Sequence, residues 1–248
     1  MIFTTVSNEP LTGQIWRMRL TGEQVEVRAG QFVEIQLPSF FLRRPISICD
    51  AESKDGRTML TLIYKVVGGG TREMTAFGYG DELDLLVPLG NGYEPERSGS
   101  ELMLIGGGVG VPPLYLLAKY LRAKGKKVSV FLGFNTASEV FYEREFKELG
   151  CKVTVATADG TKGEKGFVTD AIKAVYKDNA QAPYYYACGP VAMLRAVKSQ
   201  LGPDGEMSME ERMGCGFGVC MGCSIETRSG ARRVCKDGPV FKAKELIL

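Results

Sequence analysis

Short apolar runs, most of them alternating with polar residues, fill the N-terminal part of the chain and are separated by Gly, Pro and Asp. Alternation with a period of two is typical of strands with one buried face, and closely spaced turns favour antiparallel neighbours. Strands are expected over residues 14–20, 31–37, 46–49, 59–65 and 82–86. One short helix is expected over residues 71–77. The pattern predicts a small antiparallel β-barrel over residues 1–98.

From residue 101 the pattern changes to alternating strands and helices. Strands are expected over residues 101–105, 127–133, 152–157 and 184–188. Helices are expected over residues 111–123, 138–149, 168–176 and 191–201. Such alternation predicts a parallel sheet covered by helices, with ligands at the carboxyl ends of the strands. This α/β domain is expected to span residues 99–205, and the last segment, residues 206–248, leaves the pattern.

Composition restricts the class of protein. Lys and Arg number 31 and Asp and Glu 29, so the net charge of +2 predicts no binding to nucleic acid. No apolar stretch is long enough to cross a bilayer, and the N-terminus has no signal-peptide pattern. Seven cysteines without a secretion signal favour reduced thiols and metal binding over a disulfide framework. We expect a cytoplasmic protein that has no membrane partner.

The sequence contains no histidine. This absence excludes Ser-His-Asp and Cys-His catalysis, histidine-bearing zinc hydrolase sites and Rieske-type clusters. The chemistry of the chain is therefore expected to be carried largely by bound cofactors.

Four cysteines of the last segment, Cys215, Cys220, Cys223 and Cys235, have the spacing C-x4-C-x2-C-x11-C. Thiolates so spaced converge on a metal, and the glycines between them allow the backbone to wrap closely. The x4 and x2 gaps match the plant-type pattern of a 2Fe–2S cluster, whose fourth cysteine follows a longer gap. A zinc ribbon is an alternative, although zinc sites usually have two C-x2-C pairs and one occurs here. A pair of structural disulfides is a third interpretation.

Two motifs of the predicted barrel suit a phosphate-bearing cofactor. Arg44-Pro45-Ile46-Ser47 places a cation and a hydroxyl at the start of a strand. Ile63-Tyr64-Lys65 leads to Gly68-Gly69-Gly70-Thr71, where free N–H groups at a helix start could hold a pyrophosphate. Taken alone, each motif also fits a simpler structure, because Arg-Pro is common in surface turns and three glycines are common in flexible loops.

The first strand of the α/β domain runs into Gly106-Gly107-Gly108-Val109-Gly110-Val111-Pro112-Pro113. A glycine turn between strand and helix lets a dinucleotide pyrophosphate approach the helix N-terminus. The motif departs from G-x-G-x-x-G, because two prolines stand near the position of the third glycine. An ordinary tight turn is the alternative.

The fourth strand of this domain ends at Cys188-Gly189-Pro190, again before a helix. Its place at a carboxyl strand end favours a cofactor-facing role for Cys188, with a buried core thiol as the alternative. Cys49 and Cys151 are expected to be core thiols.

The turn after the second strand of this domain, residues 133–137, contains no charged residue. Sites for NAD usually offer an acidic group to the ribose, and sites for NADP offer basic groups to its 2′-phosphate. Glu139 and Arg144 lie farther along and are expected on an exposed helix face. Without a phosphate clamp, the site is predicted to prefer NADH.

The three segments, in this order, resemble a known family. The Arg-Pro-x-Ser barrel, the glycine–proline turn and Cys-Gly-Pro resemble the ferredoxin–NADP reductase superfamily. With the cysteine motif, the chain is similar to electron-transfer subunits of NAD-dependent (type B) dihydroorotate dehydrogenases. The resemblance implies FAD contacts from residues of the barrel: Arg44, Pro45, Ile46, Ser47, Ile63, Tyr64, Lys65, Gly70 and Thr71. It also implies that Gly107, Gly108 and Gly110 face the nicotinamide dinucleotide, with Cys188 near the reactive ring.

These sites describe a converter between hydride and single-electron transfer. A nicotinamide carries two electrons as a hydride and a cluster carries one, so a flavin is needed between NAD and the cluster. The resemblance implies a partner chain that holds FMN and oxidises dihydroorotate to orotate in pyrimidine biosynthesis. Two-fold symmetry favours a heterotetramer with two chains of each kind. The alternatives are a flavin reductase that serves a hydrogenase, a ferredoxin or another dehydrogenase, and a non-catalytic redox sensor.

The cluster loop also predicts a docking surface. Residues 213–225 include no charged residue, whereas Phe217, Val219 and Met221 are large and apolar. Such side chains either shield the cluster or form the contact with the partner chain, because interface cores are depleted in charge and enriched in Phe and Met.

Overall fold

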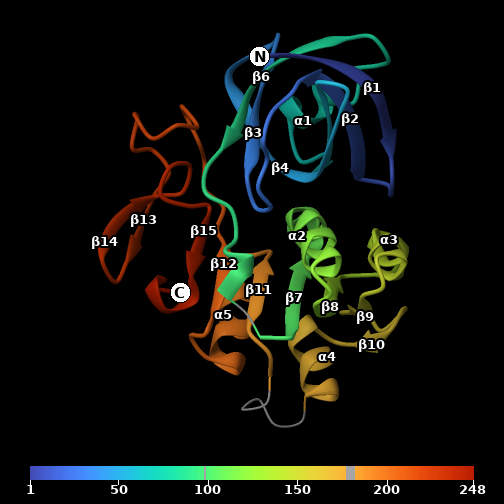
Figure 1. Cartoon of the computed structure of the whole chain (residues 1–248), viewed down its shortest axis with the longest axis vertical. Helices are drawn as coiled ribbons and strands as arrows, with labels where there is room; N and C mark the ends of the chain where they lie inside the picture. Colours follow the sequence, from blue (N-terminus) through green and yellow to red (C-terminus); the bar gives the residue numbers. More distant parts are fainter. Residues whose placement is uncertain (98, 177–181) are drawn as a thin grey trace.

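The computed structural model describes residues 1–97, 99–176 and 182–248. Six antiparallel strands close into a barrel in the order β1-β2-β5-β4-β3-β6 (Figure 1). Their bounds are β1 Ile2–Pro10, β2 Ile15–Glu23, β3 Phe32–Leu37, β4 Phe40–Lys54, β5 Arg57–Lys65 and β6 Glu82–Leu89. The short helix α1, Gly69–Met74, follows β5. The antiparallel barrel is therefore confirmed, and β1 is a strand that the alternating pattern did not predict.

The second sheet has seven strands in the order β10-β9-β8-β7-β11-β12-β15. Its strands are β7 Glu101–Gly107, β8 Lys127–Phe134, β9 Lys152–Thr157, β10 Glu164–Lys165, β11 Tyr185–Cys188, β12 Gly205–Ser208 and β15 Val240–Lys242. All neighbours are parallel except β15, which runs antiparallel to β12. The predicted parallel sheet is confirmed, and its carboxyl edge faces the barrel (Figure 1).

Helices cover both faces of this sheet. They are α2 Pro112–Ala123, α3 Glu143–Glu148, α4 Val168–Val175 and α5 Val191–Leu201. Helices α2 and α3 pack in one core with Leu102 and Leu104 of β7, while α4 and α5 pack in another with Met103 and Ile105. Alternate residues of a strand point to opposite faces, so one apolar run of β7 supplies both cores.

The single helix expected over residues 138–149 is wrong. A 3₁₀ turn, Ala137–Glu139, is followed by an extended stretch and then by α3. Tyr142 has a left-handed backbone with φ of 63°. Phe141 and Tyr142 are both buried, and their rings pack edge-on against neighbouring aromatic rings. In a regular helix, the side chains of adjacent residues point in different directions. Burying both rings in the same core therefore requires a break in the helix.

The last segment belongs partly to the sheet. Strands β12 and β15 both come from it, and a hairpin of β13 Ser224–Thr227 and β14 Gly230–Arg233 lies between them in sequence. The boundary predicted at residue 205 coincides with the start of β12. The division into three domains stays a prediction, while the hydrogen-bonded sheet continues across that boundary.

The barrel and the sheet share a core. Ile15, Cys49 and Ile63 of the barrel belong to the same buried cluster as the residues of α2. Lys119 Nζ on α2 also lies 3.0 Å from Asp50 Oδ2 and 2.7 Å from Glu52 Oε1 on β4. These contacts fix the position of the barrel over the sheet. Among the described helices, none is long and apolar enough to cross a membrane.

Candidate functional site

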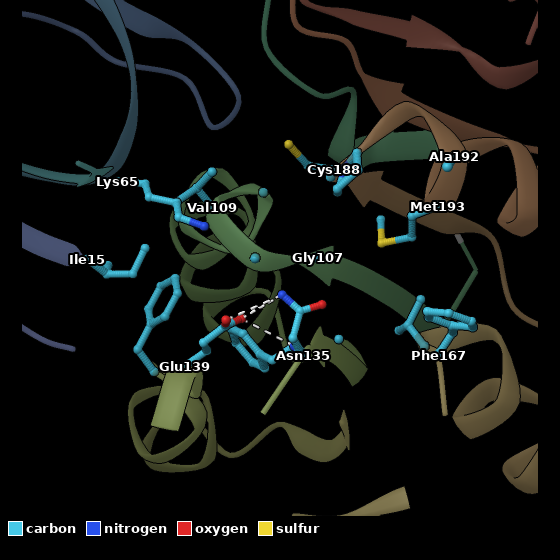
Figure 2. Close-up of a pocket in the computed structure, with 18 of the residues that line it drawn as sticks. Ile15, Lys65, Gly107, Val109, Asn135, Glu139, Phe167, Cys188, Ala192 and Met193 are labelled. Carbon is cyan, nitrogen blue, oxygen red and sulfur yellow. Dashed lines mark hydrogen bonds between the residues drawn. The ribbon is translucent and has the colours of Figure 1, made fainter. Parts of the chain in front are cut away.

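A cleft of about 840 Å³ lies between the barrel and the carboxyl edge of the parallel sheet. The barrel side contributes Ile15, Ser47 and Lys65, and the sheet side contributes the turn after β7 and the ends of β8 and β11 (Figure 2). Ligands of parallel sheets bind at this edge, because successive loops diverge there. The cleft is large enough for a nucleotide cofactor.

All three glycines predicted to face the dinucleotide line the cleft. Gly108 has φ of +52°, in the left-handed region that favours glycine. A Cβ atom on Gly110 would lie 2.2 Å from the Cys188 carbonyl oxygen, so no larger residue fits there without moving the backbone. Pro112 and Pro113 open α2, where a missing N–H costs no helical hydrogen bond. The turn therefore leaves backbone open to the cleft, as a pyrophosphate requires.

Cys188 lies at the end of β11, where it lines the cleft and is half-buried (Figure 2). Burial raises the pKa of the Cys188 thiol to about 12, although a hydrogen bond with Ser208 opposes this rise. The side chain is therefore a neutral thiol at physiological pH and not a nucleophile. It can pack against a ring in the cleft without forming a covalent bond to it.

The residues of the two predicted flavin motifs occupy different environments. Ser47 and Lys65 line the cleft, whereas Pro45 and Ile46 pair with β3 across from Glu34 and Val33. Ile63 and Tyr64 have buried side chains.

The Tyr64 hydroxyl is engaged within the barrel. It lies 3.0 Å from Asn8 Oδ1, and burial raises the pKa of this phenol to about 12. The side chains of Ile63 and Tyr64 are thus part of the protein core. Flavin contacts from these two residues stay a prediction, and they would have to come from the backbone of β5.

Arg44 lies in a cradle formed by α1 and the β3–β4 hairpin. Its guanidinium stacks over the Phe40 ring at 4.5 Å from the centroid. A Cβ atom on Gly70 would lie 2.2 Å from Arg44 Nε, so the glycine makes room for the cation. Thr71 Oγ1 accepts hydrogen bonds from the N–H groups of Val67 and Gly68 at 2.9 and 3.2 Å. Of the N–H groups expected to be free for a phosphate, that of Gly68 is therefore already engaged.

Two acidic residues line the cleft that were not predicted to do so. The expectation of an exposed helix face is wrong for Glu139, which follows β8 and accepts hydrogen bonds from Asn135 N and Nδ2 (Figure 2). Glu210 follows β12, a strand the pattern of residues did not reveal. Among the described residues of the lining, Lys65 is the only base, and it comes from the barrel. This charge distribution disfavours a 2′-phosphate near β8 and supports the predicted preference for NADH.

The four cysteines of the last segment lie close enough to interact. Cys215 interacts with Cys220 and with Cys235, and Cys235 also interacts with Cys223. Backbone N–H groups point at the sulfurs: Cys215 Sγ accepts from Val219 at 3.3 Å, and Cys223 Sγ accepts from Cys235 at 3.4 Å. Burial opposes ionisation of Cys215, but these backbone hydrogen bonds dominate and lower the pKa of its thiol to about 6. Such donors stabilise thiolates, which are the ligating form of cysteine.

These thiols fit a 2Fe–2S cluster in number and kind. Within the described part of the chain, no three His, Cys, Asp or Glu side chains already lie close enough together to hold a metal ion. Cys215, Cys220, Cys223 and Cys235 would supply the four thiolate ligands that such a cluster needs. All seven cysteines are free, which does not support the alternative of structural disulfides. The positive φ angles of Gly216 and Gly218, +74° and +93°, give the loop its tight path.

Arg233 ties the loop to the rest of the segment. Its NH1 donates to the Gly218 carbonyl oxygen at 2.9 Å, and its Nε lies 3.0 Å from Asp237 Oδ2. The cation also lies near Cys223 and Cys235.

The apolar side chains of the loop are exposed, so they do not all shield a cluster. The exposed fractions are 54% for Phe217, 74% for Val219 and 53% for Met221. We call these three residues the cluster-loop patch. An exposed group of large apolar side chains beside a redox site is typical of a protein interface.

Comparison with known families agrees with this arrangement. The profile described as "Iron-sulfur cluster binding domain of dihydroorotate dehydrogenase B" matches residues 210–247. The profile described as "Oxidoreductase NAD-binding domain" matches residues 104–199. The first match covers the segment with the four cysteines, and the second runs from within β7 into α5.

Several relatives that span nearly the whole chain share one name. Proteins called "Dihydroorotate dehydrogenase B (NAD(+)), electron transfer subunit" include one from Fusobacterium nucleatum subsp. nucleatum, 43% identical over 98% of this chain and 96% of its own length. Another, from Geobacillus sp. (strain WCH70), is 44% identical over 99% of this chain and 97% of its own length.

Solved structures share the fold. A chain of the NADH-dependent reduced ferredoxin–NADP oxidoreductase has a TM-score of 0.88 and 29% identity, over 100% of this chain and 90% of that one. Phthalate dioxygenase reductase has a TM-score of 0.68 and 20% identity, over 85% of this chain and 69% of its own. The barrel, the parallel sheet and their order are common to these proteins.

Proposed function

The chain belongs to the family of electron transfer subunits of dihydroorotate dehydrogenase B, and on this premise we propose that it passes electrons between NAD and an FMN-bearing catalytic chain. When bound, FAD exchanges a hydride with the nicotinamide and single electrons with the 2Fe–2S cluster. The catalytic chain converts dihydroorotate to orotate. Dihydroorotate chemistry itself is assigned to that chain.

One observation carries this proposal: the cleft is lined by residues of both the predicted flavin motifs and the predicted dinucleotide motif. Ser47 and Lys65 from the flavin motifs line it, as do the glycine turn and Cys188. Glu210, which also lines the cleft, precedes the first cluster cysteine by only a few residues of chain. The flavin, the dinucleotide and the cluster would therefore be neighbours, as electron transfer between them requires.

The residues of the cleft have separate tasks in this proposal. The Gly106–Gly110 turn admits the dinucleotide pyrophosphate to the N-terminus of α2. The Ser47 hydroxyl orients the flavin from the barrel side, and the neutral Cys188 thiol packs beside the nicotinamide from the sheet side. The Arg44 guanidinium in its glycine cradle binds the flavin pyrophosphate. Cys215, Cys220, Cys223 and Cys235 are the proposed cluster ligands.

The catalytic chain is proposed to bind over the cluster-loop patch. A cluster that transfers electrons to another protein lies near the surface, so the side chains around it form the contact. We assign the complex to a heterotetramer with two chains of each kind, because assemblies commonly use two-fold axes. The free cysteines support the cytoplasm as its location.

The division of labour between the chains provides the test of this function. Alone, the chain should reduce artificial dyes with NADH and leave dihydroorotate unchanged. Mixed with the catalytic chain, it should couple dihydroorotate oxidation to NAD reduction. Dihydroorotate oxidation by the isolated chain would overturn the proposal, and absence of any NADH turnover would favour a redox sensor.

The Arg44→Ala variant should bind FAD more weakly. The lost charge-assisted hydrogen bond to phosphate is worth about 1.5–3 kcal/mol, which is roughly a tenfold to hundredfold rise in Kd. Flavin retained after gel filtration, measured by absorbance, checks this. The control is Arg57→Ala. Arg57 is an exposed arginine and the first residue of β5. Equal flavin retention by the two variants would contradict the role of Arg44.

A further inference from the structure

Glu34 occupies a position of β3 where burial would favour an apolar side chain. Its neighbours Val33 and Ile35 belong to the barrel core. Alternation along the strand turns Glu34 and Phe32 to the outside of the barrel. Phe32 packs there in one core with Cys223, Val234 and Cys235. The cluster segment therefore covers this outer face, and it leaves Glu34 only 1% exposed.

The carboxyl group of Glu34 has no hydrogen-bond partner in the described structure at either oxygen. The Arg43 guanidinium is directed away from the Glu34 carboxyl group. It contacts the carboxylate and the backbone oxygen of Asp84, and on Glu34 it reaches only the main-chain oxygen. An unpaired buried carboxyl group costs several kcal/mol. Groups of this kind in native structures commonly serve a function.

The group faces the cluster loop. A Cβ atom on Gly216 would lie 2.6 Å from Glu34 Cγ and 2.9 Å from Oε1, so the side chain lies directly against the loop backbone beside Cys215. On the neighbouring strand β4, the residue beside Glu34 is Pro45 of the Arg44–Ser47 motif. Figure 1 shows the loop of the last segment next to β3 and β6. Glu34 thus stands between the proposed flavin site and the proposed cluster site.

We propose that Glu34 is a positioning residue of electron transfer, whose buried carboxylate acts through the cluster loop to lower the reduction potential of the cluster. The inference rests on the proposed function. Reduction adds one electron and one negative charge to the cluster. A carboxylate close by in a medium of low dielectric opposes that charge, and little solvent is present to screen it.

The environment of Glu34 permits the charged form above neutral pH. Burial raises the pKa of Glu34 to about 7; the charge of Cys215 adds to this rise, and the charges of Arg43 and Arg44 oppose it. The test is therefore set at pH 8.5, above this value. Arg233 of β14, which donates to the loop at Gly218, has the opposite charge, but it is engaged by Asp237.

The test is a spectroscopic redox titration of the cluster at pH 8.5 in the Glu34→Gln variant. Glutamine keeps the shape and removes the charge. At a fixed applied potential the ratio of reduced to oxidised cluster should rise about tenfold, which corresponds to about 59 mV for a one-electron couple. The matched control is Glu26→Gln, at an exposed acid of the barrel, which should leave the ratio unchanged.

Further readouts separate this role from a structural one. An unchanged or lower ratio in a Glu34→Gln protein with full iron content would overturn the inference, even if its melting temperature changed. If that variant does not hold iron, Glu34→Asp keeps the charge but withdraws it by one methylene, and the ratio should rise by less than tenfold. No rise in that variant would also overturn it. Absence of a 2Fe–2S spectrum from the unmodified protein would refute the proposed function instead.

Discussion

The Cys235→Ser variant should lose most of its iron and all electron transfer to the catalytic chain, while it continues to reduce dyes with NADH. Cys235 is 2% exposed and follows the fully buried Val234, so neighbouring side chains fix its position opposite Cys223. Serine is a poor ligand for iron compared with a thiolate. Iron should fall from two per chain, the content of a 2Fe–2S cluster, toward zero.

A serine in another buried position provides the control. Cys151 is also buried, but it lies at the start of β9 in the parallel sheet, away from the cluster segment. The Cys151→Ser variant should retain its iron and its brown colour. Full iron content in Cys235→Ser, or zinc in the unmodified protein in place of iron, would refute the cluster assignment.

The Phe217→Glu variant should bind the catalytic chain at least tenfold more weakly and still reduce dyes with NADH. Phe217 is half-exposed within the cluster-loop patch, where no charged residue occurs between residues 213 and 225. A glutamate placed there would bury an unpaired charge in the interface, at a cost of several kcal/mol. Calorimetric binding and dihydroorotate-dependent NAD reduction measure the effect.

The control for this variant is Tyr79→Glu, which places the same charge at an aromatic residue that is 88% exposed between α1 and β6. It should bind the catalytic chain as the unmodified protein does. Equal affinity of the two variants would place the contact with the catalytic chain elsewhere on the surface. Loss of dye reduction in Phe217→Glu would instead indicate damage to the flavin or dinucleotide site.

The features that the sequence predicted well are those with a strong local pattern. Apolar alternation in β2, β3 and β5, and the strand–turn–helix order around Gly106–Gly110, are repeated over several residues and need no knowledge of distant contacts. The spacing of the four cysteines is equally local. For these features, burial and backbone geometry are encoded within a single stretch of chain.

The features it did not predict depend on contacts between distant segments. Tyr142 takes a left-handed backbone because two rings must enter one core. Glu139 bends back to Asn135, so an acid expected on a helix face lines the cleft. Glu34 is buried only because the cluster segment covers the outer face of β3. Periodicity identifies the two faces of a strand, but it does not reveal what covers the second one.

Strands β12 and β15 extend the parallel sheet at its β11 edge, so the last segment and the α/β domain share one sheet. A truncated protein that ended before residue 205 would leave β11 with a row of unpaired N–H and C=O groups. It would also uncover apolar side chains that now pack against Met207 and Phe241. Such an edge invites aggregation with other chains. A two-domain reductase made by deleting the last segment is therefore expected to aggregate, because that segment completes the parallel sheet.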